Sequence, residues 1–458
     1  MTPSSRLARC RAALGGLDPS GAKTAPSMFD PDVISFAHGE GVRRPHPAVV
    51  AAGVDALLDS GAGALEDYQF LRRWRPLEDR IIGYFAGGGI DGLTSDHLCI
   101  DSGTSRLFCA FLHAVTVPGD TVLAARTYYH LLIGWCDLFG LRLECVPTAA
   151  DDDYKLTAAA LEDWYRCHPG ARARAVILFN PTQTGAVYAA AELASLADAL
   201  RSRGLVVLED TVFRFTEYPG VMPPPFLASF DPGGQIVTVG GGSKAYGLAN
   251  VRIGWACGAP RLMEQMRGHA YTTGVTVPHV AQAMAAAALA APHTYALRNS
   301  AECDLRARSI ASFFGGSSGV RVAHLPHAGH SILLDLNAYL GMRTPAGRRV
   351  TDSADLVRHL LEVGRVAVSP GLASGFDDLT ARLCFGCVGA RHTYGHDLED
   401  DELAAGFARG RAEVEAGLDR ITVALASLVA DRPDRRGTGP GNAVTCATVA
   451  PTSGGTAR

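Results

Sequence analysis

The sequence predicts an α/β protein with a mostly parallel central sheet, followed by a smaller α+β domain. Between residues 98 and 257, short apolar runs alternate with segments of helix length, a pattern typical of βα units. After residue 301 the pattern changes to one long helix, shorter strands and a closing amphipathic helix. A length of 458 residues suits one large and one small domain. We expect four regions: an N-terminal arm over 1–45, a large domain over 46–300, a small domain over 301–430 and a disordered tail over 431–458.

The individual elements follow from apolar periodicity and turn signals. The first 30 residues are polar and rich in small side chains, so we expect a loosely ordered arm, with a strand after it over 33–40. The predicted helices cover 47–58, 77–85, 105–115, 128–139, 190–201, 301–313 and 402–429. The predicted strands cover 98–100, 121–125, 143–146, 175–179, 205–210, 236–239, 253–257, 320–323, 331–334, 367–368 and 382–387.

Composition excludes several classes of protein. A net charge of −4 gives no electrostatic reason to expect nucleic acid or an anionic membrane as a partner. No apolar run approaches the ~18 residues of a membrane span, and the N-terminal arginines lack the apolar core of a secretory signal. Eleven cysteines without framework spacing fit a reducing cytoplasm. The one C-x-x-C pair, Cys384 and Cys387, has no second pair, so we predict no metal site.

A lysine follows the predicted strand 236–239, in a glycine-rich loop that ends before the next strand. Most Ser-Lys pairs in loops are solvated surface features. Lys244 is favoured as a functional residue because Arg252 follows eight residues later and because polar motifs upstream supply other parts of one site. Desolvation disfavours the ammonium form, so the amine becomes available as a nucleophile that can form a Schiff base.

Polar residues also follow other predicted strands, where ligand sites of parallel sheets lie. The 101–105 segment opens a helix, where an anion is stabilised, although Ser and Thr are also ordinary helix caps. Asn180 follows the strand 175–179 and could be only a turn former. Asp210 ends the strand 205–210, and a buried carboxylate is costly unless it is paired.

The run from Ser243 through Lys244 and Arg252 to Gly254 resembles the lysine signature of the class I and II aminotransferases, which are fold-type-I pyridoxal phosphate enzymes. The resemblance covers roughly residues 33 to 430. It implies a pyridoxal phosphate-dependent transferase that acts on an α-amino acid, with Lys244 as the catalytic Schiff-base lysine. Transamination is the leading reaction that it implies.

The resemblance also implies roles for the other motif residues. Asn180 would donate to the phenolic oxygen of the cofactor, and Asp210 would pair with its pyridine nitrogen. Tyr128 would stack on the ring, with Tyr129 as the alternative. The implied cofactor-binding residues are Ser102, Gly103, Thr104, Tyr128, Asn180, Asp210, Phe213, Ser243, Lys244, Arg252 and Tyr68. The implied substrate-binding residues are Gly39, Asn180 and Arg382, with Arg391 as a rival for the carboxylate.

Two positions depart from the family pattern. Phe213 stands where the family usually has a tyrosine that is a second donor to the phenolic oxygen. Gly241 stands where a serine often helps to bind the phosphate. The loss of the tyrosine hydroxyl removes a hydrogen bond that helps to set the pKa of the Schiff base, so reactions other than transamination stay open.

Tyr68 lies nine residues before Leu77, a spacing with which a family tyrosine reaches the cofactor phosphate of the neighbouring subunit. The resemblance therefore implies a homodimer with shared active sites. Three alternatives to transamination stay open. Asp67-Tyr68 and Tyr128-Tyr129 resemble 1-aminocyclopropane-1-carboxylate synthases, which implies γ-elimination or replacement on an S-adenosylmethionine-like substrate. The 210–214 stretch resembles pyridoxal-dependent arginine oxidases. A non-enzymatic cofactor-binding regulator is disfavoured because no basic helix-turn-helix segment lies beside the domain.

Overall fold

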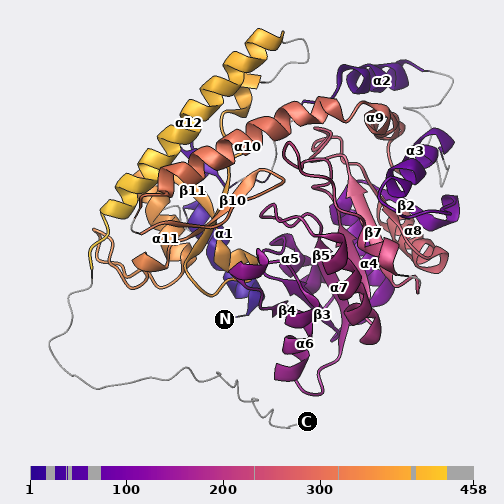
Figure 1. The fold of residues 1–458 in the computed structure, drawn as a ribbon, viewed down its shortest axis with the longest axis horizontal. Coiled ribbons are helices and arrows are strands. Elements are labelled where there is room, and N and C mark those ends of the chain that lie inside the picture. The colour runs from indigo at the N-terminus through magenta and orange to yellow at the C-terminus, as the bar shows by residue number, and fades with distance from the viewer. Residues whose placement is uncertain are drawn as a thin grey trace.

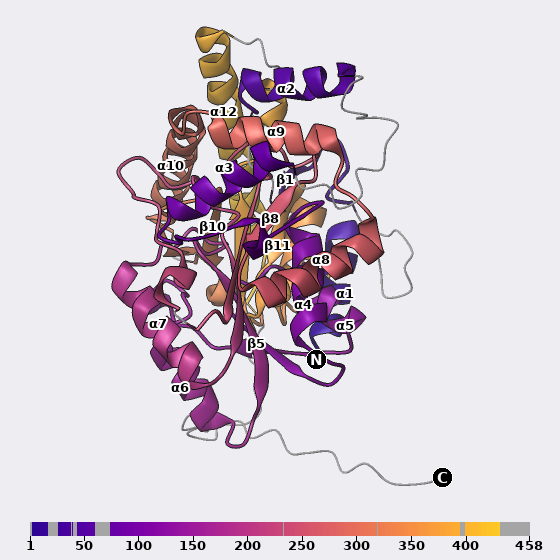
Figure 2. The ribbon, with the colours of Figure 1, turned by 90° about the vertical axis from the view of Figure 1, so that its right-hand side faces the viewer.

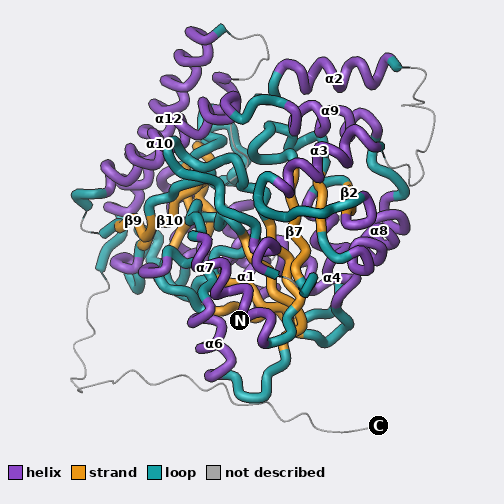
Figure 3. The backbone as a smooth tube through the Cα atoms, turned by 45° about the vertical axis from the view of Figure 1, so that its right-hand side comes forward, coloured by secondary structure: helices purple, strands orange, loops and turns teal. Residues whose placement is uncertain are grey.

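Two groups of strands organise the chain. The computed structural model describes residues 2–16, 26–37, 39, 44–59, 74–231, 233–317, 319–393 and 399–430. Figure 1 shows the strands of the larger sheet, among them β7, toward the right and those of the smaller sheet, among them β10 and β11, on the left. The long helix α10 (Thr294–Phe314) extends from the left-hand group toward the upper right. Figure 3 shows helices packed around both groups of strands.

The larger sheet has seven strands in the order β2-β8-β7-β6-β5-β3-β4. Strand β8 runs in the opposite direction to all the other strands, so the sheet is mostly parallel, as the sequence predicts. Its strands are β2 (Leu98–Asp101), β3 (Thr121–Ala125), β4 (Arg142–Val146), β5 (Ala173–Phe179), β6 (Val206–Asp210), β7 (Ile236–Gly241) and β8 (Gly254–Cys257).

Both faces of this sheet are covered, which explains the continuous apolar strands. In β3, Val122 and Ala124 pack into the cluster around α4 and α8, whereas Leu123 packs into the cluster around α6 and α7. Successive side chains of a strand point to opposite faces, so each strand supplies two cores. The helices of this part are α2 (Pro47–Leu58), α3 (Arg75–Ala86), α4 (Thr104–Val115), α5 (Leu131–Leu138), α6 (Ala158–Cys167), α7 (Ala190–Ser202), α8 (Pro260–Gly274) and α9 (His279–Ala290).

Helices α2, α3 and α9 form a separate layer, in which α9 contacts both of the others. Figure 2 shows them side by side at the top of the view. The exposed side of α2 carries Val54, Leu57 and Leu58. Among the helices that the structure describes, none combines the length and the apolar character that a membrane crossing requires.

The smaller sheet has five strands in the order β1-β11-β12-β10-β9. It contains β1 (Ile34–Phe36), which pairs in parallel with β11 although it lies in the predicted N-terminal arm. The other strands and helices are β9 (Arg321–His324), β10 (Ser331–Asp335), β11 (Val366–Pro370), β12 (Thr380–Cys384), α11 (Ser353–His359) and α12 (Asp400–Ala426). The predicted domain boundary after residue 300 falls inside α10.

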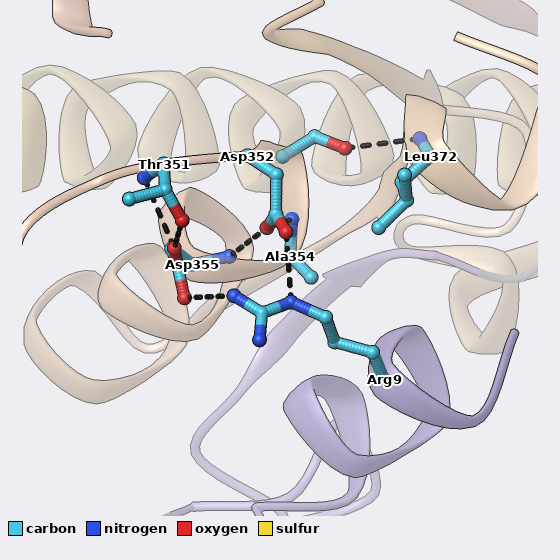
Figure 4. Close-up of polar contacts among 7 residues, drawn as sticks. Arg9, Thr351, Asp352, Ala354, Asp355 and Leu372 are labelled. Carbon is cyan, nitrogen blue, oxygen red and sulfur yellow. Dashed lines mark hydrogen bonds and ion pairs between the residues drawn. The ribbon is translucent and has the colours of Figure 1, made fainter. Parts of the chain in front are cut away.

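The prediction of a loosely ordered arm is wrong for residues 3–15, because they form helix α1 (Pro3–Gly15). Arg9 makes ion pairs of 2.8 Å with Asp352 and 2.6 Å with Asp355, at the start of α11 (Figure 4). Ser4 donates to Asp137 on α5 over 2.6 Å. These partners lie on two helices, α11 beside the smaller sheet and α5 beside the larger sheet. Tertiary contacts therefore stabilise a helix whose sequence has little apolar periodicity. The predicted tail over 431–458 lies outside the described residues.

Candidate active site

Three parallel strands end side by side at one edge of the larger sheet. Phe179 of β5 is paired with Asp210 of β6, which is paired in turn with Val239 of β7. Asn180 and Asp210 therefore lie on neighbouring strand ends, and the turn that carries Ser243 and Lys244 follows the third. The predicted grouping of these residues at the carboxyl ends of the strands is confirmed.

Lys244 donates from Nζ to the carbonyl oxygen of Gly39. Gly39 lies three residues beyond β1, which belongs to the smaller sheet. The N-terminal segment therefore crosses between the two sheets at the amine of Lys244. The structure brings together two residues that the sequence placed in the same site and that are 205 positions apart.

The turn before α4 is packed against Arg252. Gly103 has φ +92°, and a Cβ atom there would lie 2.5 Å from Nη2 of Arg252. A Cβ atom on Gly254 would lie 2.8 Å from the backbone nitrogen of Thr104. Arg252 itself is held by Ala249, whose carbonyl accepts from Nη1 over 2.7 Å. Ser102, Gly103 and Thr104 thus present the positive start of a helix beside a guanidinium, an arrangement that suits a phosphate.

The glycine at position 241 has a packing reason. A Cβ atom there would lie 2.9 Å from Cγ2 of Thr104, so a serine would push against the same turn. The missing hydroxyl at Gly241 is therefore a consequence of the close approach of β7 to the start of α4.

Asp210 is 4% exposed. Its Oδ1 accepts from the backbone nitrogen of Val212 over 2.9 Å. Burial raises the pKa of the Asp210 carboxyl from its ordinary 3.8 to about 7, although this hydrogen bond and the positive charge of Lys244 oppose the shift. A cation beside the carboxylate would offset the cost of burial, so the position suits a protonated ring nitrogen.

The side-chain amide of Asn180 is paired with protein groups, and its role as a donor to the cofactor stays a prediction. Its Nδ2 donates to Glu209 Oε1 over 2.8 Å and to the carbonyl of Pro225 over 3.1 Å, which uses both amide hydrogens. Rotating the amide by 180° would place its oxygen against the Pro225 carbonyl, which can only accept. Asn180 therefore anchors the buried Glu209, which also accepts from Leu227 and Thr238.

A second amide in the same turn, Gln183, was not identified from the sequence. Its Oε1 accepts from Nη1 of Arg382 over 2.6 Å. The Nε atom of Arg382 is buried and has no partner among the described residues. An unpaired buried guanidinium nitrogen is costly, so Arg382 has a donor that suits a carboxylate. The only available signal was that Gln183 lies two residues before the turn glycine, Gly185.

Tyr128 is 3% exposed and packs into the core of the larger sheet. A Cβ atom on Gly375 would lie 2.9 Å from its ring. Tyr129 is only partly buried, and its ring lies 4.8 Å from that of His130. Tyr128 is therefore the more enclosed of the two rings, and the choice between Tyr128 and Tyr129 as the stacking ring stays a prediction.

Phe213 contacts a histidine that the sequence did not indicate. The ring centroids of Phe213 and His330 are 5.5 Å apart, and Nε2 of His330 lies 2.6 Å from the Gly39 carbonyl oxygen. No sequence motif indicates His330, which directly precedes β10.

Two other predicted residues are not placed in the site by the structure. Tyr68 lies outside the described residues. Arg391 is exposed and pairs with Glu413 over 2.9 Å.

The family model for aminotransferase class I and II matches residues 31–394. A bifunctional aspartate aminotransferase and glutamate/aspartate-prephenate aminotransferase from Petunia hybrida is 25% identical over 77% of this chain and 73% of its own length. An aspartate aminotransferase from Rhizobium meliloti strain 1021 is 28% identical over 61% of this chain and 68% of its own length.

The same fold occurs in solved structures. The crystal structure of the aspartate aminotransferase from Rhizobium meliloti superposes with a TM-score of 0.74 at 23% identity, over 87% of this chain and 92% of that one. The match to the family model spans most of the chain and includes the strand-end residues described above. The chain therefore belongs to the class I and II aminotransferase family and is a pyridoxal phosphate-dependent aminotransferase.

Proposed function

We propose that the chain transfers the amino group of an α-amino acid through pyridoxal phosphate bound covalently to Lys244. The observation that carries this assignment is the position of Lys244, one strand away from Asp210 and beside the start of α4. When bound, the cofactor supplies a ring that withdraws electrons from the α-carbon of the amino acid. The names of the relatives support transamination over elimination or oxidation.

The residues of the chain have separate tasks in this proposal. Ser102, Gly103, Thr104 and Arg252, with Ser243 beside the lysine, bind the phosphate through backbone and side-chain donors. Asp210 holds a proton at the ring nitrogen by pairing with it. Lys244 takes the proton from the α-carbon and returns it, because its amine is free when the substrate is attached. Tyr129, with its less buried ring, is the better stacking partner.

Arg382 binds the substrate carboxylate in this proposal. Its Nη1 is already oriented by Gln183. Its unpartnered Nε lies on the same edge of the guanidinium as Nη2, so these two atoms can form a bidentate clamp. Gln183 has its oxygen on Arg382, so its amide hydrogens face other groups. We therefore assign to Gln183, rather than Asn180, the donation to the phenolic oxygen of the cofactor.

Borohydride reduction of the protein with pyridoxal phosphate tests the central assignment, because it fixes the cofactor on the lysine that binds it. Peptide mapping is expected to find the label on Lys244. The other two lysines of the chain are internal controls, Lys23 and Lys155; Lys155 is buried and pairs with Glu192 over 2.6 Å. A label on Lys155 or Lys23 would refute the proposal.

Product analysis with one equivalent of bound cofactor separates the reaction types. Transamination yields one 2-oxo acid per site without free ammonia. Methylthioadenosine from S-adenosylmethionine would indicate γ-elimination instead, and consumption of oxygen would indicate an oxidase.

The substitution Gln183→Glu tests the assignment of the amide donor. Gln183→Glu keeps an oxygen for Arg382 but removes the amide hydrogens, so the spectroscopic pKa of the bound cofactor should rise by about one unit. Asn180→Ala should leave that pKa unchanged and lower the melting temperature, because Glu209 loses a buried donor. The opposite pattern would return the role to Asn180.

We propose that the active enzyme is a cytoplasmic homodimer in which Tyr68 of each subunit completes the other site. No disulfide joins any two of the ten cysteines that the structure describes, which supports a reducing compartment. Mixing Tyr68→Phe and Lys244→Ala chains should restore activity, since one site of the mixed dimer has both native residues. Mixed chains that stay inactive although they form dimers would exclude shared sites, and fractionation against a cytoplasmic marker enzyme tests the location.

A further inference from the structure

Two side chains contact the carbonyl oxygen of Gly39. Lys244 donates to it from Nζ, and His330 lies on it with Nε2 at 2.6 Å. A carbonyl oxygen can only accept, so Nε2 of His330 must carry a hydrogen. This requirement holds for the neutral Nε2-protonated ring and for the imidazolium alike. His330 is therefore a donor to the atom that also binds the reactive amine.

The His330 ring is held from several sides. It is 3% exposed and packs against Phe213 with ring centroids 5.5 Å apart. Its own carbonyl accepts from the backbone nitrogen of Gly386 over 3.2 Å. The next residue, Ser331, donates to the backbone carbonyl of Gln183 over 2.6 Å. His330 is thus a rigid donor on the smaller sheet that reaches a backbone oxygen beside the larger sheet.

Gly39 can be held only through its backbone. It has no side chain, and a Cβ atom there would meet nothing within 4 Å. Among the described residues, the pairing of β1 with β11 ends at Phe36, and Ser369 Oγ donates to the carbonyl of Ala37 over 3.1 Å. His330 adds a contact at the Gly39 oxygen itself that does not depend on the lysine. That contact matters because the lysine amine leaves Gly39 when it bonds to another group.

We propose that His330 is a positioning residue for Lys244. It holds the Gly39 carbonyl at the point to which the amine of Lys244 returns whenever that amine is released. A fixed acceptor limits the conformations of a long, flexible side chain and so keeps the amine oriented for proton transfer. The proposal rests on the proposed function, because it takes Lys244 as the lysine that bonds the cofactor.

Two substitutions separate the hydrogen bond from the packing of the ring. His330→Phe keeps a ring against Phe213 but has no donor, whereas His330→Gln retains an N–H donor on a side chain of similar length. We expect covalent attachment of pyridoxal phosphate to the cofactor-free His330→Phe protein to be about tenfold slower than in the native protein. The same variant should lose a similar factor in kcat for exchange of the substrate α-proton with solvent, with little change in KM. His330→Gln should recover both rates to within about twofold.

Different results separate this inference from the function on which it rests. If the native protein attaches no cofactor at Lys244, the proposed function fails. If the native protein does so and the two His330 variants have equal rates, only the role of His330 fails. A measurement on the native protein tests the proposal even if a variant misfolds. The Nε2 hydrogen of His330 can be observed by NMR after labelling histidine with ¹⁵N. It should exchange slowly with water. Fast exchange would overturn the proposal.

Discussion

The site has two sides that are built in different ways. The side that we propose for the cofactor comprises Ser102, Gly103, Thr104, Asp210 and Arg252, all at the ends of strands in the larger sheet or in the turns that follow them. The side that we propose for the substrate comprises Gly39, Gln183, His330 and Arg382, which combine one turn of the larger sheet with segments of the smaller sheet. Lys244 lies between the two sides through its contact with Gly39.

The first side is built mainly by close backbone packing, and the second mainly by contacts between side chains. On the cofactor side, glycines allow backbone and guanidinium to approach closely, as at Gly103 and Gly254. On the substrate side, pairs of side chains from distant segments meet, as in the hydrogen bond between Gln183 and Arg382. Local sequence patterns encode the first kind of site, whereas the second kind depends on how two sheets pack.

The largest effect should come from Asp210, on the cofactor side. Its carboxyl has a folded pKa of about 7 against an ordinary value of 3.8, so the cofactor-free protein binds an extra proton in this range. The stability that this proton gives is fully present below about pH 4 and is lost as pH rises through 7, by an amount on the order of a few kcal/mol. Asp210→Asn cannot ionise, so its melting temperature should fall less between pH 5 and 8.

The matched control for Asp210 is Asp163→Asn, which changes an exposed carboxylate and should follow the native protein. Pyridoxal phosphate should remove most of the loss above pH 7 in the native protein, because a protonated ring nitrogen pairs with the carboxylate. Parallel melting curves for the native and Asp210→Asn proteins would show that this carboxyl is not the group that titrates.

Arg382→Lys tests the substrate side. Lysine keeps the charge but loses the forked pair of donors, so the preference for amino acids over the corresponding amines should fall by about 1.5–3 kcal/mol. Binding of the cofactor should be unchanged, which would sharpen the separation of the two sides. Arg391→Lys is the matched control, and a loss of preference in that variant instead would move the carboxylate site to Arg391.

Gly103→Ala tests whether close backbone packing builds the cofactor side. The new Cβ atom would lie 2.5 Å from Arg252, and the alanine backbone would have to adopt φ +92°. The affinity for pyridoxal phosphate should therefore fall by about 1–2 kcal/mol. Gly119→Ala is the control, since φ is +94° there and nothing lies within 4 Å. Titration with the cofactor should detect no change in this control, and an equal loss in both variants would assign the effect to backbone strain alone.

The smallest effect is expected from Phe213→Tyr, at the boundary of the two sides. A hydroxyl that donates to the phenolic oxygen stabilises its anionic form, so the spectroscopic pKa of the bound cofactor should fall by up to about one unit. Formation of 2-oxo acid should increase relative to other products. Phe213→Leu adds no donor and is the control; a titration curve that Phe213→Tyr leaves unchanged would place the side chain away from that oxygen.

The sequence by itself determined the α/β fold class, the position of nearly every strand, and the placement at strand ends of the residues that we propose for the cofactor side. These features follow from short segments, because a strand end, a glycine turn and a helix start are adjacent in the chain. The predicted strand 121–125 matches β3, and the predicted helix 47–58 matches α2. The boundary of helix α5 was less accurate, since it begins at Leu131 rather than at residue 128.

Only the tertiary structure decided the contacts on the side that we propose for the substrate. Asn180 donates both amide hydrogens, to Glu209 and Pro225. Gln183 accepts from Arg382, and His330 lies beside Gly39. It also made a helix of residues 3–15, where the sequence alone predicted a loose arm. The physical reason is common to these cases: the partners are far apart in sequence, and which polar atoms a side chain satisfies depends on the groups that packing places around it.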